Sequence, residues 1–334
     1  MRKPAAILLA SASLVVATAA HAAPDVVVSI KPIHSLVASV MQGVAEPKLI
    51  VDGAASPHTY SMKPSNAKAV ADADIVFWVG PTMEAFLDKP LDALGGKAMV
   101  VALGDAPGLE KLTFREGGPF EAHDDGDEQG EGHDRVTEKA HHDDHGHDAH
   151  EAHAHEGHSH EGFDTHLWLD PENAKAMVKE IEARLVAADP ANVAIYTRNT
   201  LALLKRIDAL DVEIAATVAP VKNKPFIVFH DAYQYFEHHY GVKVAGSITV
   251  SPETAPGAER LKEIKAKIAG LGATCVFAEP QFTPKLINVV TEGTRAKSGV
   301  LDPEGATLKA GPDLYFELMR TIATSLNDCL GKDS

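Results

Sequence analysis

A 46-residue segment near the middle of the chain, 116–161, limits most strongly what this chain can fold into. It contains 15 Asp and Glu and 11 His but only one aromatic residue, Phe120. Such a stretch has too little apolar surface to offset the entropy lost on ordering, so we expect it to be disordered. It is therefore predicted to be an insertion, with folded structure on either side of it.

The first 22 residues have the pattern of a secretory signal peptide. Arg2 and Lys3 precede an apolar run that ends near Ala20, and Ala20-His21-Ala22 offers small residues at the two positions that a signal peptidase reads. Cleavage there predicts a mature protein that begins at residue 23 and resides in the periplasm. An uncleaved anchor is the alternative, and no later apolar stretch is long enough to span a membrane.

The parts on both sides of the insertion alternate strand-like apolar runs with helical stretches, which is typical of α/β lobes with mainly parallel sheets. Before the insertion we expect strands at 25–30, 48–51, 74–79 and 98–103, and helices at 33–41 and 66–73, the latter with Ser65 as its N-cap. After Pro220 we expect strands at 226–229, 242–248, 274–278 and 299–301, and helices at 232–239, 258–270, 284–296 and 313–330.

A helical connector is predicted between these two parts. Pro171 suits the first turn of a helix that runs to about Ala188, and a second helical stretch follows from Ala191 to Ala219. Its apolar positions recur every three or four residues: Leu201, Leu204, Ile207, Leu210 and Ile214. A helix of this length would extend roughly 40 Å, enough to bridge two lobes. The predicted domains are an N-terminal α/β lobe over 23–170, the connector over 171–220 and a C-terminal α/β lobe over 221–334.

The acidic charge of the chain is concentrated in the insertion. The net charge is −16, and it becomes −18 when the two positive charges of the signal peptide are removed. Residues 116–161 carry −13 of this, so the rest of the mature protein carries only −5. That small charge is ordinary for a folded domain and argues against nucleic acid as a partner.

Three histidines outside the insertion occupy similar places in the predicted fold. His58 follows a loop after a short strand, His166 lies where the chain re-enters the fold, and His230 ends an apolar run. Ligands of open α/β sheets bind beyond the carboxyl ends of the strands, so these side chains can converge between the lobes. Neutral imidazole is a preferred zinc ligand. The alternative is that all three are partly buried and bonded to backbone carbonyls.

The other histidines outside the insertion and the signal peptide, His34, His238 and His239, show no such placement. The adjacent pair lies in an amphipathic, Tyr-rich stretch, and we expect it to be solvated.

Several segments resemble the cluster A-I solute-binding proteins of ABC transporters, and most closely their zinc-binding branch. The segment 58–65 (HTYSMKPS) resembles the first metal-ligand motif of this family, 164–171 (DTHLWLDP) the second and 229–233 (FHDAY) the third. The segment 275–281, Asp302-Pro303 and the His/acid insertion between the first two motifs fit as well. The resemblance covers the whole mature chain. It implies two α/β lobes joined by a long rigid helix, a metal site in the cleft, no catalysis, and a monomer that delivers its metal to an ABC permease at the inner membrane.

The two cysteines, Cys275 and Cys329, are predicted to form a disulfide. Export would bring them to a compartment where disulfides persist, and two separate buried thiols are the alternative. The resemblance implies the bridge, because the family carries a disulfide within the second lobe.

The resemblance also bears on the choice of metal and on the fourth ligand. Manganese-binding members have a carboxylate where this chain has His230, and imidazole suits Zn²⁺ better than Mn²⁺. Some zinc-binding members have Glu directly before the first His, but Pro57 occupies that place here. Asp313 is the predicted fourth ligand by likeness to the manganese branch; it can equally be an N-cap, with water completing the site. Glu279 is expected to line the cleft without binding the metal.

The insertion is predicted to bind additional zinc, because flexible His at high local density raises the effective concentration of ligand groups. Its candidate ligands are His141, His142, His145, His147, His150, His153, His155, His158 and His160. Each such site should be weaker than the cleft site, because ordering the chain costs entropy. The alternative is a solvated acidic linker with incidental histidines.

Three other functions fit parts of the pattern. The alternative most similar to a zinc importer component is an importer component for manganese or another divalent metal. A periplasmic metal buffer or adhesin is the second alternative. A zinc hydrolase also uses three His and a water, but the chain contains no HExxH and no obvious general base.

Overall fold

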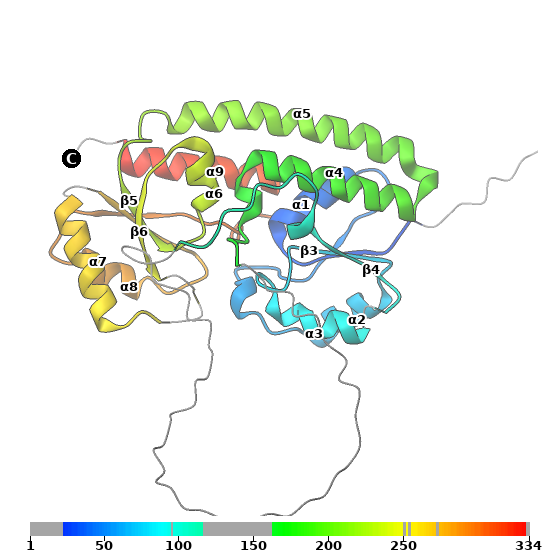
Figure 1. Ribbon diagram of the computed structural model, residues 1–334, viewed down its shortest axis with the longest axis horizontal. Helices are drawn as coiled ribbons and strands as arrows, with labels where there is room; N and C mark the ends of the chain where they lie inside the picture. The colour runs from blue at the N-terminus through cyan, green and yellow to red at the C-terminus, as the bar shows by residue number, and fades with distance from the viewer. Residues whose placement is uncertain are drawn as a thin grey trace, which may run out of the picture.

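The computed structural model describes residues 23–94, 96–115, 162–249, 252, 255–271 and 274–331. The predicted signal peptide and the insertion lie outside these residues. Within them, the chain forms two four-stranded parallel sheets flanked by helices (Figure 1). No helix in this part of the chain is both long enough and apolar enough to cross a membrane.

The first sheet contains β1 (Val26–Val28), β2 (Lys48–Leu49), β3 (Ile75–Trp78) and β4 (Met99–Ala102), in the order β2-β1-β3-β4. The strands β1 and β3 are buried throughout, as expected for apolar runs in a sheet covered on both faces. The helices of this half are α1 (Lys31–Val40), α2 (Pro64–Asp72) and α3 (Ala85–Leu94). A short 3₁₀ turn, η1 (Pro57–Thr59), lies between β2 and α2, and another, η2 (Leu103–Asp105), follows β4.

The second sheet repeats this topology with β5 (Phe226–His230), β6 (Val244–Thr249), β7 (Cys275–Ala278) and β8 (Lys297–Val300), in the order β6-β5-β7-β8. Its helices are α6 (Gln234–Tyr240), α7 (Ala258–Leu271), α8 (Lys285–Thr291) and α9 (Leu314–Leu330). The helices α7 and α8 cover one face of the sheet (Figure 1), over a separate small core that includes Ile227, Ile264 and Val276. In both sheets the order reverses next to the first strand, and ligands bind at such switch points.

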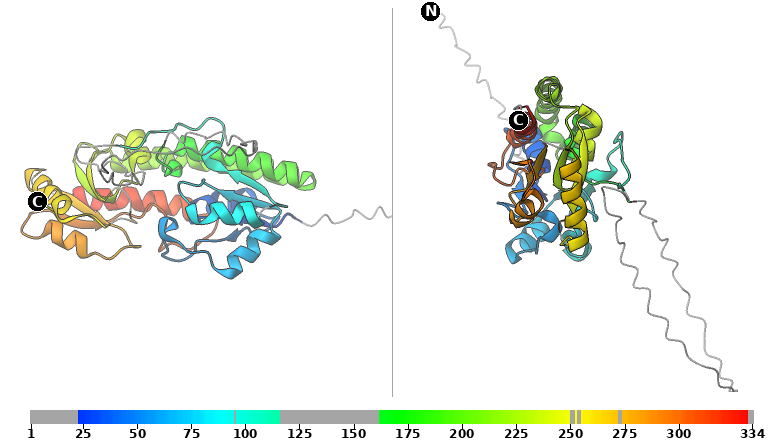
Figure 2. Two further views of the ribbon diagram at one scale, coloured as in Figure 1. Left: turned by 60° about the horizontal axis from the view of Figure 1, so that its bottom comes forward. Right: turned by 90° about the vertical axis from the view of Figure 1, so that its left-hand side faces the viewer.

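The predicted helical stretches between the sheets are present. The turn η3 (Leu167–Leu169) leads into α4 (Pro171–Ala188), whose N-cap Asp170 accepts a hydrogen bond from the Glu172 N–H. After η4 (Pro190–Asn192), α5 (Val193–Val218) continues for 26 residues, which is about 39 Å at the helical rise. This helix runs along both halves of the molecule (Figures 1 and 2). Its buried stripe includes Ile207, Leu210 and Ile214 as predicted, but Leu201 is exposed.

The last part of the chain crosses back to the first half, which the sequence did not indicate. The Lys31 ammonium donates hydrogen bonds to the carbonyls of Ala306 (2.8 Å) and Leu308 (3.0 Å). Ser39 Oγ donates to the Pro312 carbonyl at 3.0 Å, and the Tyr315 N–H donates to Ser35 Oγ at 3.0 Å. The two sheets are therefore held together by α5, which runs along both halves, and by the start of α9, over one largely continuous core.

Two predicted helix boundaries were wrong for local reasons. Helix α2 begins at Pro64 with Lys63 as its N-cap, so Ser65 lies inside the first turn; proline is favoured there because its ring presets the helical φ. Helix α8 ends at Thr291 instead of 296, because Glu292 leaves the helical conformation (ψ 126°) and enters a type II turn that needs glycine next, at Gly293 with φ 73°.

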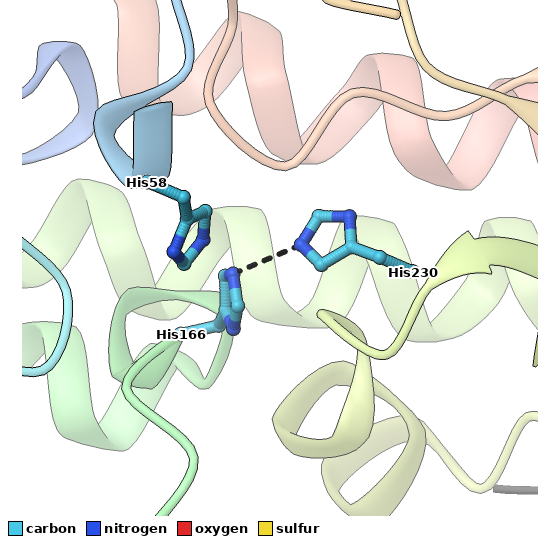
Figure 3. Close-up of side chains that lie close together, drawn as sticks. All are labelled: His58, His166 and His230. Atoms are coloured by element: carbon cyan, nitrogen blue, oxygen red, sulfur yellow. Dashed lines mark hydrogen bonds between the residues drawn. The ribbon is translucent and has the colours of Figure 1, made fainter. Parts of the chain in front are cut away.

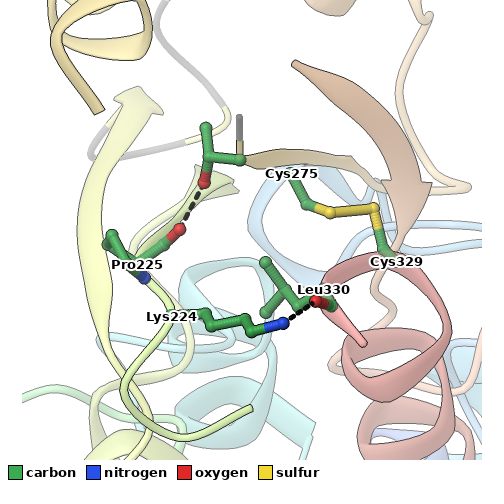
Figure 4. Close-up of a disulfide and its surroundings, with 6 residues drawn as sticks. Lys224, Pro225, Cys275, Cys329 and Leu330 are labelled. Carbon is green, nitrogen blue, oxygen red and sulfur yellow. Dashed lines mark hydrogen bonds between the residues drawn. A yellow bond between two sulfur atoms is a disulfide. The ribbon is translucent and has the colours of Figure 1, made fainter. Parts of the chain in front are cut away.

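The predicted disulfide is confirmed. It joins Cys275, the first residue of β7, to Cys329 near the end of α9 (Figure 4). Close by, Lys224 Nζ donates a hydrogen bond to the Leu330 carbonyl at 2.8 Å. A cross-link over a separation of 54 residues stabilises a fold by about 4 kcal/mol in the chain-entropy model.

The expectation for the pair His238 and His239 was half right. His238 is exposed, but His239 lies between two carboxylates that belong to other helices. Its Nε2 is 2.9 Å from Asp211 of α5, and its Nδ1 is 3.4 Å from Asp170, the N-cap of α4. The hydrogen bond with Asp170 is the main reason why the pKa of His239 is raised to about 9, and the Asp211 carboxylate adds to it against the effect of burial.

This bridge predicts a pH-dependent loss of stability in the variant His239→Gln. The folded pKa lies above the ordinary value of about 6.5, so the charged ring stabilises the fold fully below that pH, and this contribution disappears as the pH rises through 9. We expect the variant to lose about 1–3 kcal/mol of unfolding free energy at pH 6, and the deficit to shrink toward pH 10. Urea unfolding at several pH values measures this, with the exposed His238→Gln as the control. A deficit that stays constant with pH would contradict the charged bridge.

Candidate metal centre

Three histidines from distant parts of the chain converge between the two halves (Figure 3). His58 is the middle residue of η1, beyond the carboxyl end of β2. His166 is the N-cap of η3, and His230 is the last residue of β5. The side chains predicted as ligands are thus brought together, and each is held by a rigid turn or strand end.

The spacing of the rings suits a single metal ion. One nitrogen from each ring can be chosen so that all three lie within 4.8 Å of one another. The Nε2 atoms of His166 and His230 are 3.3 Å apart. A tetrahedral zinc ion with bonds of 2.0–2.1 Å requires ligand atoms about 3.3–3.4 Å apart, so this pair already has the required separation.

Two buried carboxylates orient the rings of the ligand pair. Asp164 Oδ1 lies 2.7 Å from His166 Nδ1, and Glu279 Oε1 lies 2.6 Å from His230 Nδ1. When Nδ1–H donates to a carboxylate, the lone pair of Nε2 points the other way and is available to a metal. Glu279 directly follows β7, so it and His230 flank the β5–β7 switch point of the second sheet.

Burial and charge favour a dication at this point. His166, His230 and both carboxylates are at most 5 % exposed. A buried anion needs a compensating charge, and a bound dication would balance two carboxylates through the rings that they orient.

The protonation states fit metal binding as well. The pKa of His58 is lowered well below its ordinary value, first because burial disfavours the charged ring and then because the two other rings are near. Burial also acts to lower the pKa of His230, but the charge and hydrogen bond of Glu279 outweigh it and raise the pKa. His58 is therefore a neutral ligand at pH 7, and a metal at His230 would replace a proton that Glu279 otherwise attracts.

The structure does not bring Asp313 to the three imidazoles. Its carboxylate is 68 % exposed and accepts a hydrogen bond from Arg206 Nη2 of α5 at 2.6 Å. It is the N-cap residue of α9 by position, although its side chain makes no capping hydrogen bond. The start of α9 packs against α1, which leaves this carboxylate on the outer surface.

Sequence reasoning missed the role of Asp164 and described Glu279 only as lining the cleft. Each accepts a hydrogen bond from a ligand ring. A signal for Asp164 was present, since an acid two residues before a candidate ligand can reach back to its ring. Glu279 is 49 residues from His230 in the chain, so its contact depends on the neighbouring positions of β5 and β7.

Comparison with known families agrees with this arrangement. Residues 26–329 match the family model described as zinc-uptake complex component A, periplasmic. The chain belongs to this family. Relatives that support the assignment are named High-affinity zinc uptake system protein ZnuA. The protein from Brucella suis is 57 % identical over 92 % of both chains, and that from Yersinia pestis is 36 % identical over 97 % of this chain and 96 % of its own.

Solved structures show the same fold at low sequence identity. A crystal structure of ZnuA matches with a TM-score of 0.70 at 22 % identity, covering 92 % of this chain and 99 % of that one. The periplasmic zinc binding protein TroA from Treponema pallidum matches with a TM-score of 0.73 at 21 % identity over the same shares. The predicted two-sheet α/β fold is thereby confirmed for this member of the family.

The orienting carboxylates give a testable consequence. We expect Glu279→Gln and Asp164→Asn each to weaken zinc binding by about 10–100-fold, because a neutral acceptor makes the attached ring a poorer ligand. Competition with a zinc chelator of known affinity measures the effect. Asp208→Asn is the control, because that carboxylate is 61 % exposed and pairs with Lys175 at the surface. Unchanged affinity in both variants would refute the role assigned to these carboxylates.

Proposed function

We propose that this protein is the periplasmic component of an ABC importer for zinc. It captures Zn²⁺ between its two halves and delivers the ion to a permease in the inner membrane. The observation that carries the proposal is the convergence of three imidazoles within 4.8 Å of one another, two of them oriented by buried carboxylates. The names of the relatives, which describe high-affinity zinc uptake, support the same reading.

The donor set favours zinc over manganese or another hard cation. Among the described residues, the group that can hold an ion consists only of His58, His166 and His230, without a carboxylate oxygen. Imidazole suits Zn²⁺, whereas Mn²⁺ prefers oxygen ligands, so an importer component for manganese is the weaker candidate.

Water is the fourth ligand in this proposal. Asp313 is engaged by Arg206 at the surface, and Glu279 and Asp164 are already bonded to ligand rings. Three protein nitrogens and one water complete a tetrahedral zinc site. The water is not proposed as a nucleophile, because the protein binds its cargo without turnover.

The remaining features of the proposal concern the setting of the protein. Cleavage of residues 1–22 releases it into the periplasm, where the Cys275–Cys329 disulfide is stable. It acts as a monomer, with zinc and the permease as partners and no contact with nucleic acid. A periplasmic metal buffer or adhesin could have the same site. Deleting the gene for such a protein would not prevent growth at low zinc, whereas deleting the gene for an importer component would.

The insertion, residues 116–161, is proposed to gather or sense zinc and to pass it to the cleft. Its 11 His and 15 acids offer many weak ligand positions close to one another.

Removing two ligands tests the proposed site. We expect His58→Ala/His230→Ala to lose tight zinc binding entirely, because one remaining imidazole cannot hold the ion against a chelator. Titration calorimetry with zinc measures this, and the exposed His238→Ala is the control. Nanomolar-range binding that persists in the double variant would overturn the site.

Deleting residues 116–161 separates tight zinc binding in the cleft from weaker zinc binding by the insertion. We expect the shortened protein to keep one tight zinc site and to lose several weaker ones, because the cleft ligands all lie outside the deletion. Calorimetric stoichiometry and affinity measure both classes in one titration. Loss of the tight site would contradict the independence of the cleft from the insertion.

A further inference from the structure

The six residues that precede the insertion, 110–115, form a strap that crosses from the first half of the molecule to the second. The strap, which is the teal segment in Figure 1, follows η2 and reaches α6. The Leu112 N–H donates a hydrogen bond to the Tyr235 hydroxyl at 3.0 Å, and Gln234 Nε2 donates to the Thr113 carbonyl at 2.9 Å. Two backbone groups of the strap are therefore hydrogen-bonded to side chains in the first turn of α6.

The opposite edge of the strap contacts the segment that carries His166. Thr113 pairs with Phe163 in an antiparallel bridge, and the Asp164 N–H donates to the Leu112 carbonyl at 2.9 Å. Asp164 is the carboxylate that orients the His166 ring. The backbone position of this carboxylate is thus set by the strap.

Arg115 ends the strap and carries its strongest contacts. Its Nε donates to Asp231 Oδ2 at 3.0 Å, its Nη2 donates to the other oxygen of the same carboxylate, and its Nη1 donates to Glu237 of α6. The side chains are 22 % exposed for Arg115, 9 % for Asp231 and 21 % for Glu237. A planar guanidinium that binds one carboxylate with two donors fixes direction as well as distance, which a lysine cannot do.

Asp231 directly follows the ligand His230. The Ala232 N–H donates to the His230 carbonyl at 2.9 Å, so the chain turns tightly at Asp231 between β5 and α6. Arg115 therefore holds the turn that bears one ligand, while the strap behind it holds the carboxylate that orients another. A continuous series of contacts joins His166 to His230 through protein alone.

We propose that Arg115 is a positioning residue that sets how long the cleft retains zinc. This inference rests on the proposed zinc site. The guanidinium fastens the strap to the β5–α6 turn and keeps the Nε2 atoms of His166 and His230 at the separation that one ion requires. Without it, Asp231 is a buried carboxylate beside a ligand and lacks its main compensating charge, so the turn rearranges toward solvent. Metal sites tolerate displacements of only about 0.5 Å, and bound zinc then leaves faster.

The test is the rate of zinc release from the full-length protein loaded with one equivalent of zinc. Stopped-flow mixing with excess chelator gives the rate for the wild type, Arg115→Gln and Arg115→Lys, and thermal unfolding of the metal-free proteins is measured alongside. We expect release to be at least about tenfold faster in Arg115→Gln, with Arg115→Lys intermediate because it keeps the charge but loses the two-donor geometry. Arg184→Gln is the matched control, because Arg184 pairs with Glu180 at the surface, away from the strap.

The outcomes separate this inference from the proposed function. Release at the wild-type rate in both Arg115 variants overturns the inference, even when metal-free stability falls, since a purely structural role predicts that pattern. If Arg115→Gln does not fold, the Arg115→Lys rate decides in the same way. A wild-type protein without a tight site sensitive to His58→Ala/His230→Ala refutes the proposed function itself, whatever the Arg115 variants do.

Discussion

The hydrogen bonds from the Nδ1 atoms of His166 and His230 to buried carboxylates are the interactions on which the candidate site depends. An imidazole can present either nitrogen, and only a fixed partner on one side commits the other side to a ligand. Asp164 and Glu279 supply that partner at 2.7 and 2.6 Å. Their burial raises the cost of leaving their charge uncompensated, so the site is polarised for a dication before any ion arrives.

These contacts require two halves of the molecule to keep a fixed relation, and the fold provides it in three ways. The helix α5 runs along both halves, the segment before α9 is bonded to Lys31 of α1, and His239 links α6 to the N-cap of α4. Most of the apolar core is also continuous across the halves. Such an arrangement favours small adjustments around a bound ion over a wide hinge motion, because a large rotation would break buried contacts on several elements at once.

Much of the fold followed from local patterns. The runs 75–79 and 226–229 are apolar without alternation, and each contains a strand that is buried on both faces. Pro171 begins a helix as predicted. Where prediction failed, a residue acted through a contact that the sequence does not display. Leu201 has the right spacing for a buried stripe, yet the face of α5 that packs is set by its neighbours. Asp313 matches a ligand position by sequence likeness, but α9 docks on α1, and this places its carboxylate beside Arg206.

The sequence by itself indicated most of the strands and helices, although not α3, and it identified the three candidate imidazoles and the His-rich acidic stretch that interrupts the first half. These are properties of composition and of spacing over a few residues. Only the tertiary structure decided that Glu279 orients the His230 ring, that Asp313 is turned away from the site, and that Arg115 lies against Asp231. These contacts join residues that are 49 to 116 positions apart, and only the packing of whole sheets and helices fixes such distances.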